Sequence, residues 1–165
     1  MALNGCCLTA TEVAASEVSF DLVPETLSRT AFEHSKVGDL FNAERSLRFG
    51  DEVGGHLVSG HIDGVVFVSG VESFEVSKVV TFQVPPHLMK FILEKGYIGL
   101  NGASLTVAHV DKAASAFKVA LIPETLERTT FGGVKVGDRV NLEIDRTTQA
   151  VVTTVERMRE EVAGA

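Results

Sequence analysis

The sequence predicts an all-β protein made of two similar modules, and three observations support this fold class. Short runs of β-branched and aromatic residues alternate with turn residues at a spacing of roughly 8 to 15 residues, which is typical of an antiparallel barrel or sandwich. Helical patterns are scarce. Three sequence blocks occur twice, in the same order, at an offset of 97 to 99 residues. A repeat of this length is domain-sized, so we expect two copies of one module.

The strand and helix predictions follow from these patterns. A helix is predicted over residues 86–95, where proline opens it, apolar residues recur three to four apart and glycine follows. One helical turn is predicted at residues 24–27 and at the equivalent residues 123–126. An amphipathic helix with a narrow apolar stripe, suited to oligomerisation, is predicted over residues 153–162. Strands are predicted at residues 18–22, 40–44, 64–68, 79–84, 104–110, 116–122 and 139–144.

The repeated blocks are nearly identical in sequence. They pair residues 4–9 (Asn-Gly-Cys-Cys-Leu-Thr) with 101–106, residues 23–30 with 122–129, and residues 36–39 (Lys-Val-Gly-Asp) with 135–138. Two similar modules imply two similar sites, and a duplicated site suits a reaction between two like molecules.

The two copies differ in length. More than 40 residues with at least two strands and a helix precede Asn101, whereas three residues precede Asn4. The first module is therefore expected to lack its front half and to leave strand edges unpaired. A wrongly assigned start codon is the explanation that the sequence favours, with a deliberate truncation and natural loss as the alternatives.

Composition excludes several classes of function. The chain has 165 residues, of which 45% are hydrophobic and 22% charged, and a net charge of −7. It has no basic run for a nucleic acid and no apolar stretch of the roughly 18 to 20 residues that span a bilayer, and its first residues show no basic region leading into an apolar one. We expect a cytoplasmic protein. Cys6 and Cys7 are adjacent without CxxC spacing, which argues against a structural zinc site or a disulfide framework and for reduced thiols.

Five segments in order resemble the riboflavin synthase α-chain, or lumazine-binding, family. They are residues 4–9, 54–62 (Gly-Gly-His-Leu-Val-Ser-Gly-His-Ile), 95–99, 101–106 and 121–130. The resemblance implies tandem six-stranded Greek-key barrels and a short C-terminal helix, with a partial first barrel at residues 1–52, a complete second barrel at 53–150 and the helix at 151–165.

The resemblance also implies an activity. The family converts two molecules of 6,7-dimethyl-8-ribityllumazine into riboflavin and a diaminopyrimidine, 5-amino-6-(D-ribitylamino)uracil, by transfer of a four-carbon unit, without a metal or an organic cofactor. It implies a homotrimer, with each active site between barrels of neighbouring chains, and the lumazine synthase capsid as a further partner. Two rival functions stay open: a module that binds lumazine or flavin without turnover, and a purely structural trimerisation domain.

The resemblance assigns catalysis to four residues. Cys7 and Ser104 are equivalent in the two copies and would act as nucleophiles or orient water, although a small buried cysteine is also common in cores. His61, after a glycine that permits close approach to a ligand, would act as acid or base, and so would Asp145; the alternative for His61 is an exposed histidine at a strand end. His56 is a second candidate histidine.

The substrate-binding residues implied by the resemblance surround these four. Thr9 and Thr106 would form hydrogen bonds to the pteridine or the ribityl chain. The Pro-Glu-Thr-Leu turns would contact the ribityl chain and the pteridine edge, although Glu25 and Glu124 are also typical of helix starts. Lys95 would contact the ligand, although a lysine at a helix end is usually a solvated charge. The full set is Cys7, Leu8, Thr9, Asp21, Leu22, Val23, Pro24, Glu25, Thr26, Gly60, His61, Ile62, Lys95, Ser104, Leu105, Thr106, Ala120, Leu121, Ile122, Pro123, Glu124 and Thr125.

Overall fold

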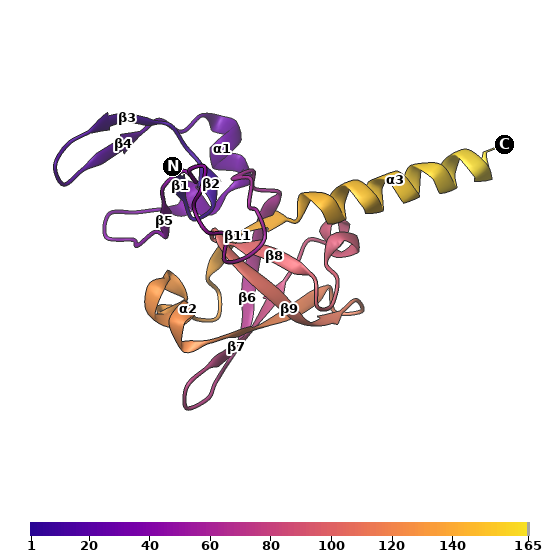
Figure 1. Ribbon diagram of the computed structural model, residues 1–165. Coiled ribbons are helices and arrows are strands. Elements are labelled where there is room, and N and C mark those ends of the chain that lie inside the picture. The colour runs from indigo at the N-terminus through magenta and orange to yellow at the C-terminus, as the bar shows by residue number, and fades with distance from the viewer. Residues whose placement is uncertain (165) are drawn as a thin grey trace.

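The computed structural model describes residues 1–164, which form an open N-terminal part, a closed barrel and a projecting helix (Figure 1). The helices are α1 (Pro24–Arg29), α2 (Pro123–Arg128) and α3 (Arg146–Ala163), and the 3₁₀ turns are η1 (Ala31–His34), η2 (Pro86–Phe91) and η3 (Thr130–Gly133). The strands are β1 (Ala2–Leu3), β2 (Cys6–Cys7), β3 (Ala10–Val13), β4 (Val18–Phe20), β5 (Ala43–Glu44), β6 (Gly64–Ser73), β7 (Lys78–Gln83), β8 (Tyr97–Leu100), β9 (Ala103–Asp111), β10 (Ala116–Leu121) and β11 (Arg139–Ile144).

Strands β6 to β11 close into an antiparallel barrel in the order β10-β7-β6-β11-β8-β9. Alternate residues of a strand point to opposite faces, so one set fills the barrel. In β7, Val80 and Phe82 are fully buried, and the ring of Phe82 stacks on that of Phe117 with 5.3 Å between centroids. The predicted all-β class, with a barrel of six strands, is confirmed.

The predicted helix over residues 86–95 is wrong in type and length. Residues 86–91 form the 3₁₀ turn η2, Ile92 has extended backbone, and Lys95 is left-handed with a φ of 66°. The physical reason is packing: Leu88 and Phe91 are buried on the barrel, and a spacing of three residues aligns side chains in a 3₁₀ turn.

The first module does not close into a barrel within residues 1–62. Strands β2, β1 and β5 form one small sheet, and β3 pairs only with β4 in a hairpin. Its core is a small cluster around Cys6, Leu8 and Phe32, whereas Leu40 and Phe49 are exposed. The expected incomplete first barrel is confirmed, and the strand predicted over residues 40–44 is reduced to β5.

The two modules meet back to back at their equivalent Asn-Gly turns. Asn4 and Gly5 have positive φ values of 43° and 77°, and Asn101 and Gly102 have values of 44° and 83°. A Cβ on Gly5 would lie 2.6 Å from the backbone nitrogen of Gly102. Only glycine fits at this contact, which lies on an approximate two-fold axis because equivalent residues touch each other.

Two asparagines fasten this junction in the same symmetric way. The Asn42 side chain donates from Nδ2 to the carbonyl of Asn101 at 3.0 Å, and its Oδ1 accepts from the first N–H of η3 at 2.8 Å. The Asn141 side chain donates to the carbonyl of Asn4 at 2.9 Å, and its Oδ1 accepts from the first N–H of η1 at 2.7 Å. Each side chain therefore satisfies backbone groups of the other module.

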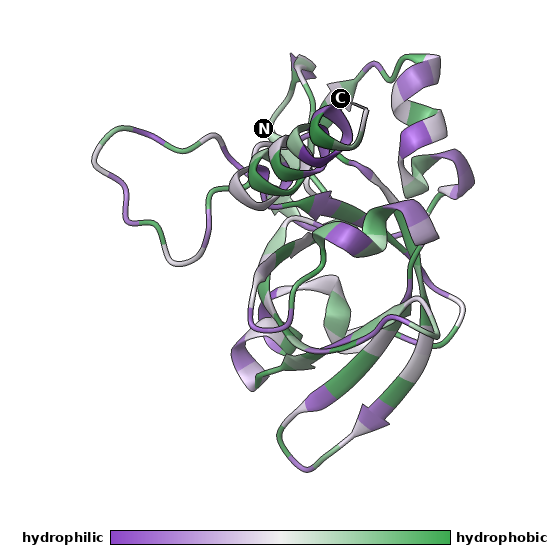
Figure 2. Ribbon diagram, turned by 90° about the vertical axis from the view of Figure 1, so that its right-hand side faces the viewer, coloured by the Kyte–Doolittle hydropathy of each residue, from purple (hydrophilic) through white to green (hydrophobic). Residues whose placement is uncertain are grey.

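Helix α3 leaves the barrel and projects away from it (Figure 1), and Figure 2 views it end-on, above the barrel. It begins at Arg146, earlier than the predicted residue 153, because Asp145 caps it. No residue of α3 is buried, and its apolar stripe of Val151, Val155, Met158 and Val162 is exposed. Within residues 1–164, no helix is long and apolar enough to span a membrane.

Candidate functional site

The candidate residues of the first module occupy the outward face of its β2 segment. Cys7 and Thr9 are exposed, whereas the alternate residues Cys6 and Leu8 are buried in the small core. This alternation is the period of an extended strand, in which successive side chains point to opposite faces. Cys7 is a free cysteine, so its thiol is accessible for chemistry.

The second module repeats the arrangement on β9. Ser104 is half-buried and Thr106 exposed, whereas Leu105 and Val107 point into the barrel core. Leu121 on β10 is also fully buried. The side chains of Leu8, Leu105 and Leu121, predicted to bind substrate, therefore belong to the two cores, and a ligand can reach only their backbone.

Residues 54–63, here called the connecting segment, touch both of these faces. The N–H of Cys7 donates to the carbonyl of Gly60 at 2.8 Å, and a Cβ on Gly60 would lie 2.5 Å from that of Cys7. A Cβ on Gly55 would lie 2.5 Å from Oγ of Ser104. One short segment thus reaches both equivalent residues, each through a glycine.

Glu143 anchors the middle of the connecting segment to β11. Its side chain is 3% exposed, and Oε1 accepts from the backbone N–H of Ser59 at 2.5 Å and from the hydroxyl of Ser59 at 2.7 Å. Oε2 accepts from the N–H of Gly60 at 3.1 Å. These three donors satisfy the buried carboxylate, which would otherwise be costly.

Arg146, the first residue of α3, anchors the end of the same segment. Its Nη2 donates to the carbonyl of His61 at 2.5 Å and its Nη1 to the carboxylate of Asp63 at 3.1 Å. The His61 ring is exposed, with Nδ1 3.2 Å from Oγ of Ser59. The residue that contacts Cys7 is therefore Gly60, which precedes His61, and the His61 ring pairs with Ser59.

His56 is joined to Ser104. The backbone N–H of His56 donates to Oγ of Ser104 at 3.0 Å, and ring Nδ1 lies 2.7 Å from the same oxygen. The ring stacks on Tyr97 with 5.2 Å between centroids. Burial lowers the pKa of His56, an effect that the negative charges of Asp145 and Glu143 partly oppose. Ring Nε2 is buried and has no hydrogen-bond partner within residues 1–164.

Asp145, predicted as a catalytic residue, is the N-cap of α3. Its Oδ2 accepts from the N–H of Thr148 at 2.7 Å and from the hydroxyl of Thr148 at 2.8 Å. Burial favours the neutral acid, but the hydrogen bonds from Thr148 outweigh it and lower the pKa of Asp145. The carboxylate is therefore an ionised acceptor already bound to the helix it starts.

The Pro-Glu-Thr-Leu turns lie at equivalent places in the two modules. Glu25 pairs with Arg29 at 2.9 Å in α1, and Glu124 pairs with Arg128 in α2. Both carboxylates thus have partners in their own helix. This fits the alternative in which the two glutamates serve helix starts. Residues 21–26 lead from β4 into α1 and residues 120–125 from β10 into α2, where the predicted contacts other than Leu22, Leu121, Thr26 and Thr125 are exposed.

Lys95 lies near the second site. Its backbone N–H donates to the carbonyl of Val107 at 2.8 Å, next to the pairing of Tyr97 with Thr106. The residue is exposed. The structure therefore places Lys95 beside the part of β9 that carries Thr106 and Val107, and Val107 lies three residues along the strand from Ser104.

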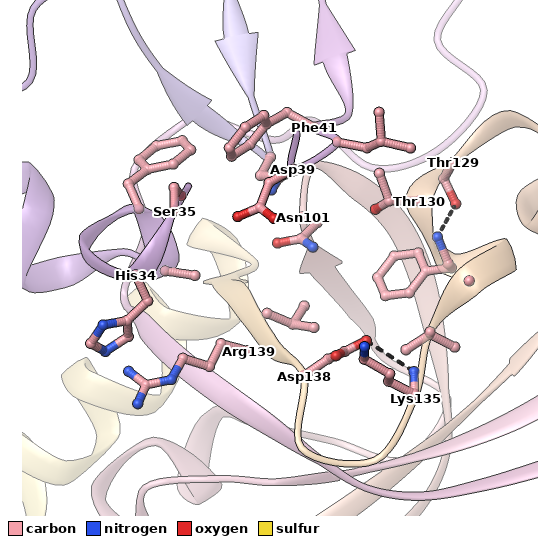
Figure 3. A pocket seen from close by; sticks show the side chains of 18 of the residues that line it. His34, Ser35, Asp39, Phe41, Asn101, Thr129, Thr130, Lys135, Asp138 and Arg139 are labelled. Atoms are coloured by element: carbon pink, nitrogen blue, oxygen red, sulfur yellow. Dashed lines mark hydrogen bonds between the residues drawn. The ribbon is translucent and has the colours of Figure 1, made fainter. Parts of the chain in front are cut away.

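A cavity of about 680 Å³ lies elsewhere, between the first module and the turn that precedes β11 (Figure 3). His34, Asp39, Lys135 and Arg139 line it, together with Asn4 and Asn101 of the two Asn-Gly turns. The N–H of Lys135 donates to the carboxylate of Asp138 at 2.9 Å, as drawn in Figure 3. None of the predicted site residues lines this cavity, so its walls belong to the module junction.

The sequence model of the family described as "Lumazine binding domain" matches residues 1–46 and 59–145. The chain belongs to the lumazine-binding family. Riboflavin synthase of Escherichia coli (strain K12) is 54% identical over 159 residues, which cover 96% of this chain and 74% of that relative. Riboflavin synthase of Chlamydia pneumoniae is 40% identical over 158 residues, covering 96% and 76%.

Solved structures of LumP share this fold. LumP complexed with riboflavin superimposes with a TM-score of 0.81 at 27% identity, covering 88% of this chain and 78% of LumP. LumP complexed with 6,7-dimethyl-8-(1'-D-ribityl) lumazine gives a TM-score of 0.76 at 27% identity, covering 87% and 76%.

The structure adds residues that sequence reasoning missed. Glu143 and Arg146 hold the connecting segment, and Tyr97 packs against His56. Glu143 carries a signal that was available, since its charge stands between the apolar residues Leu142 and Ile144 of a strand. Arg146 carries none, because an arginine in the first turn of a helix is ordinarily solvated.

Proposed function

We propose that this protein is a riboflavin synthase, which converts two molecules of 6,7-dimethyl-8-ribityllumazine into riboflavin and 5-amino-6-(D-ribitylamino)uracil by four-carbon transfer. The observation that carries the proposal is the 54% identity to the Escherichia coli riboflavin synthase across 96% of the chain. The duplicated outward faces support it, because a reaction between two like molecules needs two like sites.

The proposed roles follow the two faces. Cys7 and Ser104 meet the substrate at equivalent points, with Thr9 and Thr106 two residues further along as hydroxyl partners. Cys7 is the exposed thiol that adds to an electron-poor ring or orients water toward it. His61, which follows the glycine that contacts Cys7, is the acid or base of this face. Lys95 contributes positive charge near Thr106.

Most of the rate acceleration in this proposal comes from holding two heterocycles face to face. Fixing two reactants in a productive orientation can lower a barrier by about 7 to 11 kcal/mol. The substrate itself is the electron sink. The residues on the two faces therefore need only to bind, orient and exchange protons.

We further propose a cytoplasmic homotrimer in which α3 joins the chains and each active site lies between neighbouring copies. The exposed apolar stripe of α3 supports this assembly, since such a stripe is ordinarily covered. The lumazine synthase capsid is the further partner that the family resemblance suggests.

Binding without turnover is the second candidate function, and LumP favours it, because its solved complexes hold lumazine, riboflavin or flavin mononucleotide. The deciding experiment mixes the purified protein with 6,7-dimethyl-8-ribityllumazine and follows riboflavin fluorescence. We expect turnover, a loss of at least about tenfold in kcat for Cys7→Ala, and no change for the control Ser77→Ala, in the turn between β6 and β7. Bound but unconverted substrate would establish the second function.

A further inference from the structure

Two contacts with His56 constrain the direction in which the Ser104 hydroxyl points. The hydroxyl oxygen accepts from the backbone N–H of His56 at 3.0 Å, and it has one proton of its own to donate. The contact with ring Nδ1 is 2.7 Å. A neutral imidazole either accepts at Nδ1 and carries its proton on Nε2, or donates from Nδ1. In the first arrangement the Ser104 hydroxyl makes one bond in each direction, because it accepts from the backbone N–H and donates its own proton to Nδ1.

This arrangement has a consequence for a ligand. With its proton given to His56 and one lone pair taken by the backbone N–H, Ser104 has only an acceptor site left. We propose that His56 is a positioning residue that makes Ser104 an obligate hydrogen-bond acceptor toward the ligand. The second half-site, meaning the outward face of the second module around Ser104, then selects a hydrogen-bond donor of the ligand, an N–H or hydroxyl of the ribitylated heterocycle. This inference rests on the proposed function for the identity of the ligand.

The connecting segment makes the contact specific. Gly55 lets the chain approach until a Cβ would lie 2.5 Å from Oγ of Ser104, and the Tyr97 ring holds the imidazole from the other side at 5.2 Å. In the first half-site, around Cys7, the arrangement is different. There Gly60 meets Cys7 in the same way, but the His61 ring lies beside Ser59 at 3.2 Å and is exposed.

Protonation of His56 would reverse the direction of the hydrogen bond between Ser104 and Nδ1. A protonated ring must donate from Nδ1, so Ser104 would accept twice and turn its own proton toward the ligand. The charges that act on the ring are the carboxylates of Asp145 and Glu143, and Tyr97 is the titratable group stacked on it. Because burial places the pKa of His56 below its ordinary value of about 6.5, the reversal occurs below that pH.

The test measures riboflavin affinity by fluorescence titration at pH 7.5 and pH 5.0. We expect wild type to lose about tenfold in affinity at the lower pH, which is the scale of one mismatched polar contact. His56→Asn keeps an amide oxygen near the position of Nδ1 without a titratable group, so its affinity should stay within about twofold of wild type at pH 7.5 and change little with pH. His56→Ala should bind more weakly at both pH values. His87→Asn, at an exposed histidine, should retain the wild-type pH dependence.

A second measurement keeps the inference separate from the proposed function. Nitrogen NMR of the imidazole at pH 7.5, without ligand, should show the His56 proton on Nε2 and not on Nδ1. A proton on Nδ1, or a His56→Asn variant that keeps the wild-type loss of affinity at pH 5.0, would overturn the inference. Failure of every variant to convert substrate, with the NMR result as expected, would instead overturn only the proposed enzyme activity.

Discussion

A single methyl group at residue 55 would collide with the hydroxyl of Ser104. We expect Gly55→Ala to displace either the connecting segment or Ser104 and to weaken riboflavin binding by about tenfold, in line with the roughly 1–3 kcal/mol cost of overpacking. Gly54→Ala is the matched control, because nothing lies within 4 Å of its added Cβ. Fluorescence titration checks both variants, and equal affinities for the two would contradict the close approach at residue 55.

For single residues, the sequence predicts which face of a strand a side chain occupies better than it predicts the hydrogen-bond partner of that side chain. Equivalence of Cys7 and Ser104 follows from the repeat, and their shared outward face follows from strand alternation. The partner of Ser104 does not follow, because His56 is brought to it by a fold in the connecting segment that no local pattern specifies. The same limit applies to Asp145, whose capping bonds to Thr148 appear only once α3 is known to start at Arg146.

At the scale of elements, the cap of α3 makes a prediction about stability and pH. The pKa of Asp145 is lower in the folded protein than its ordinary value. The stability that its carboxylate contributes is therefore fully present above the pKa of the unfolded state, and it is lost as the pH falls through the pKa of the folded state. We expect Asp145→Ala to lower the free energy of unfolding by about 0.5–2 kcal/mol at pH 7. The difference from wild type should shrink below about pH 3.9, the ordinary aspartate value.

Urea unfolding monitored by circular dichroism measures this difference. Thr153→Ala, an exposed position inside α3, is the control and should change stability by less than about 0.5 kcal/mol. A variant at Asp145 that is destabilised equally at pH 7 and pH 3 would show that the carboxylate charge plays no part in the cap.

The elements also show where sequence patterns fail. The strand at residues 139–144 is predicted to its ends, because a run of six residues is bounded by turn residues on both sides. The turn at residues 86–91 is misjudged as a longer helix, because apolar spacing cannot separate a 3₁₀ turn pinned by buried Leu88 and Phe91 from an α-helix. Tertiary packing decides that difference.

At the scale of the molecule, the junction between modules depends on two equivalent asparagines in different surroundings. Asn141 is fully buried, whereas Asn42 is only half-buried. Each alanine substitution leaves two backbone groups without partners, at about 1–3 kcal/mol per buried group. We expect Asn141→Ala to destabilise the protein by several kcal/mol by this estimate, and Asn42→Ala less, because water can replace its side chain. Thermal unfolding tests this order, and equal losses would contradict it.

Assembly is a second property at this scale. The stripe on α3 ends in Met158 and Val162, which are 60% and 80% exposed in the single chain. We expect Met158→Glu to shift the protein from trimer to monomer in light scattering, because a charge cannot be buried between helices without a partner. Glu160→Gln, at an exposed polar position of α3, should leave the assembly intact. A wild-type monomer would remove the proposed role of α3.

The overall class, the repeat and the open first module follow from sequence because they depend on long patterns. The relative placement of the two modules does not, since it depends on Gly5 meeting Gly102 and on two asparagines that each cross to the other copy. Such contacts join residues about a hundred positions apart, and nothing local distinguishes them from ordinary turn residues.

The connecting segment has one more consequence. Two identical faces would treat two identical molecules alike, yet a dismutation requires one molecule to give up what the other takes. Residues 54–63 treat the two copies differently: they hold the ring of His56 against Ser104 on one side, whereas on the other side they meet Cys7 through Gly60 and leave the exposed ring of His61 beside Ser59. The two otherwise equivalent faces are therefore chemically unequal, as a reaction between a giver and a receiver demands.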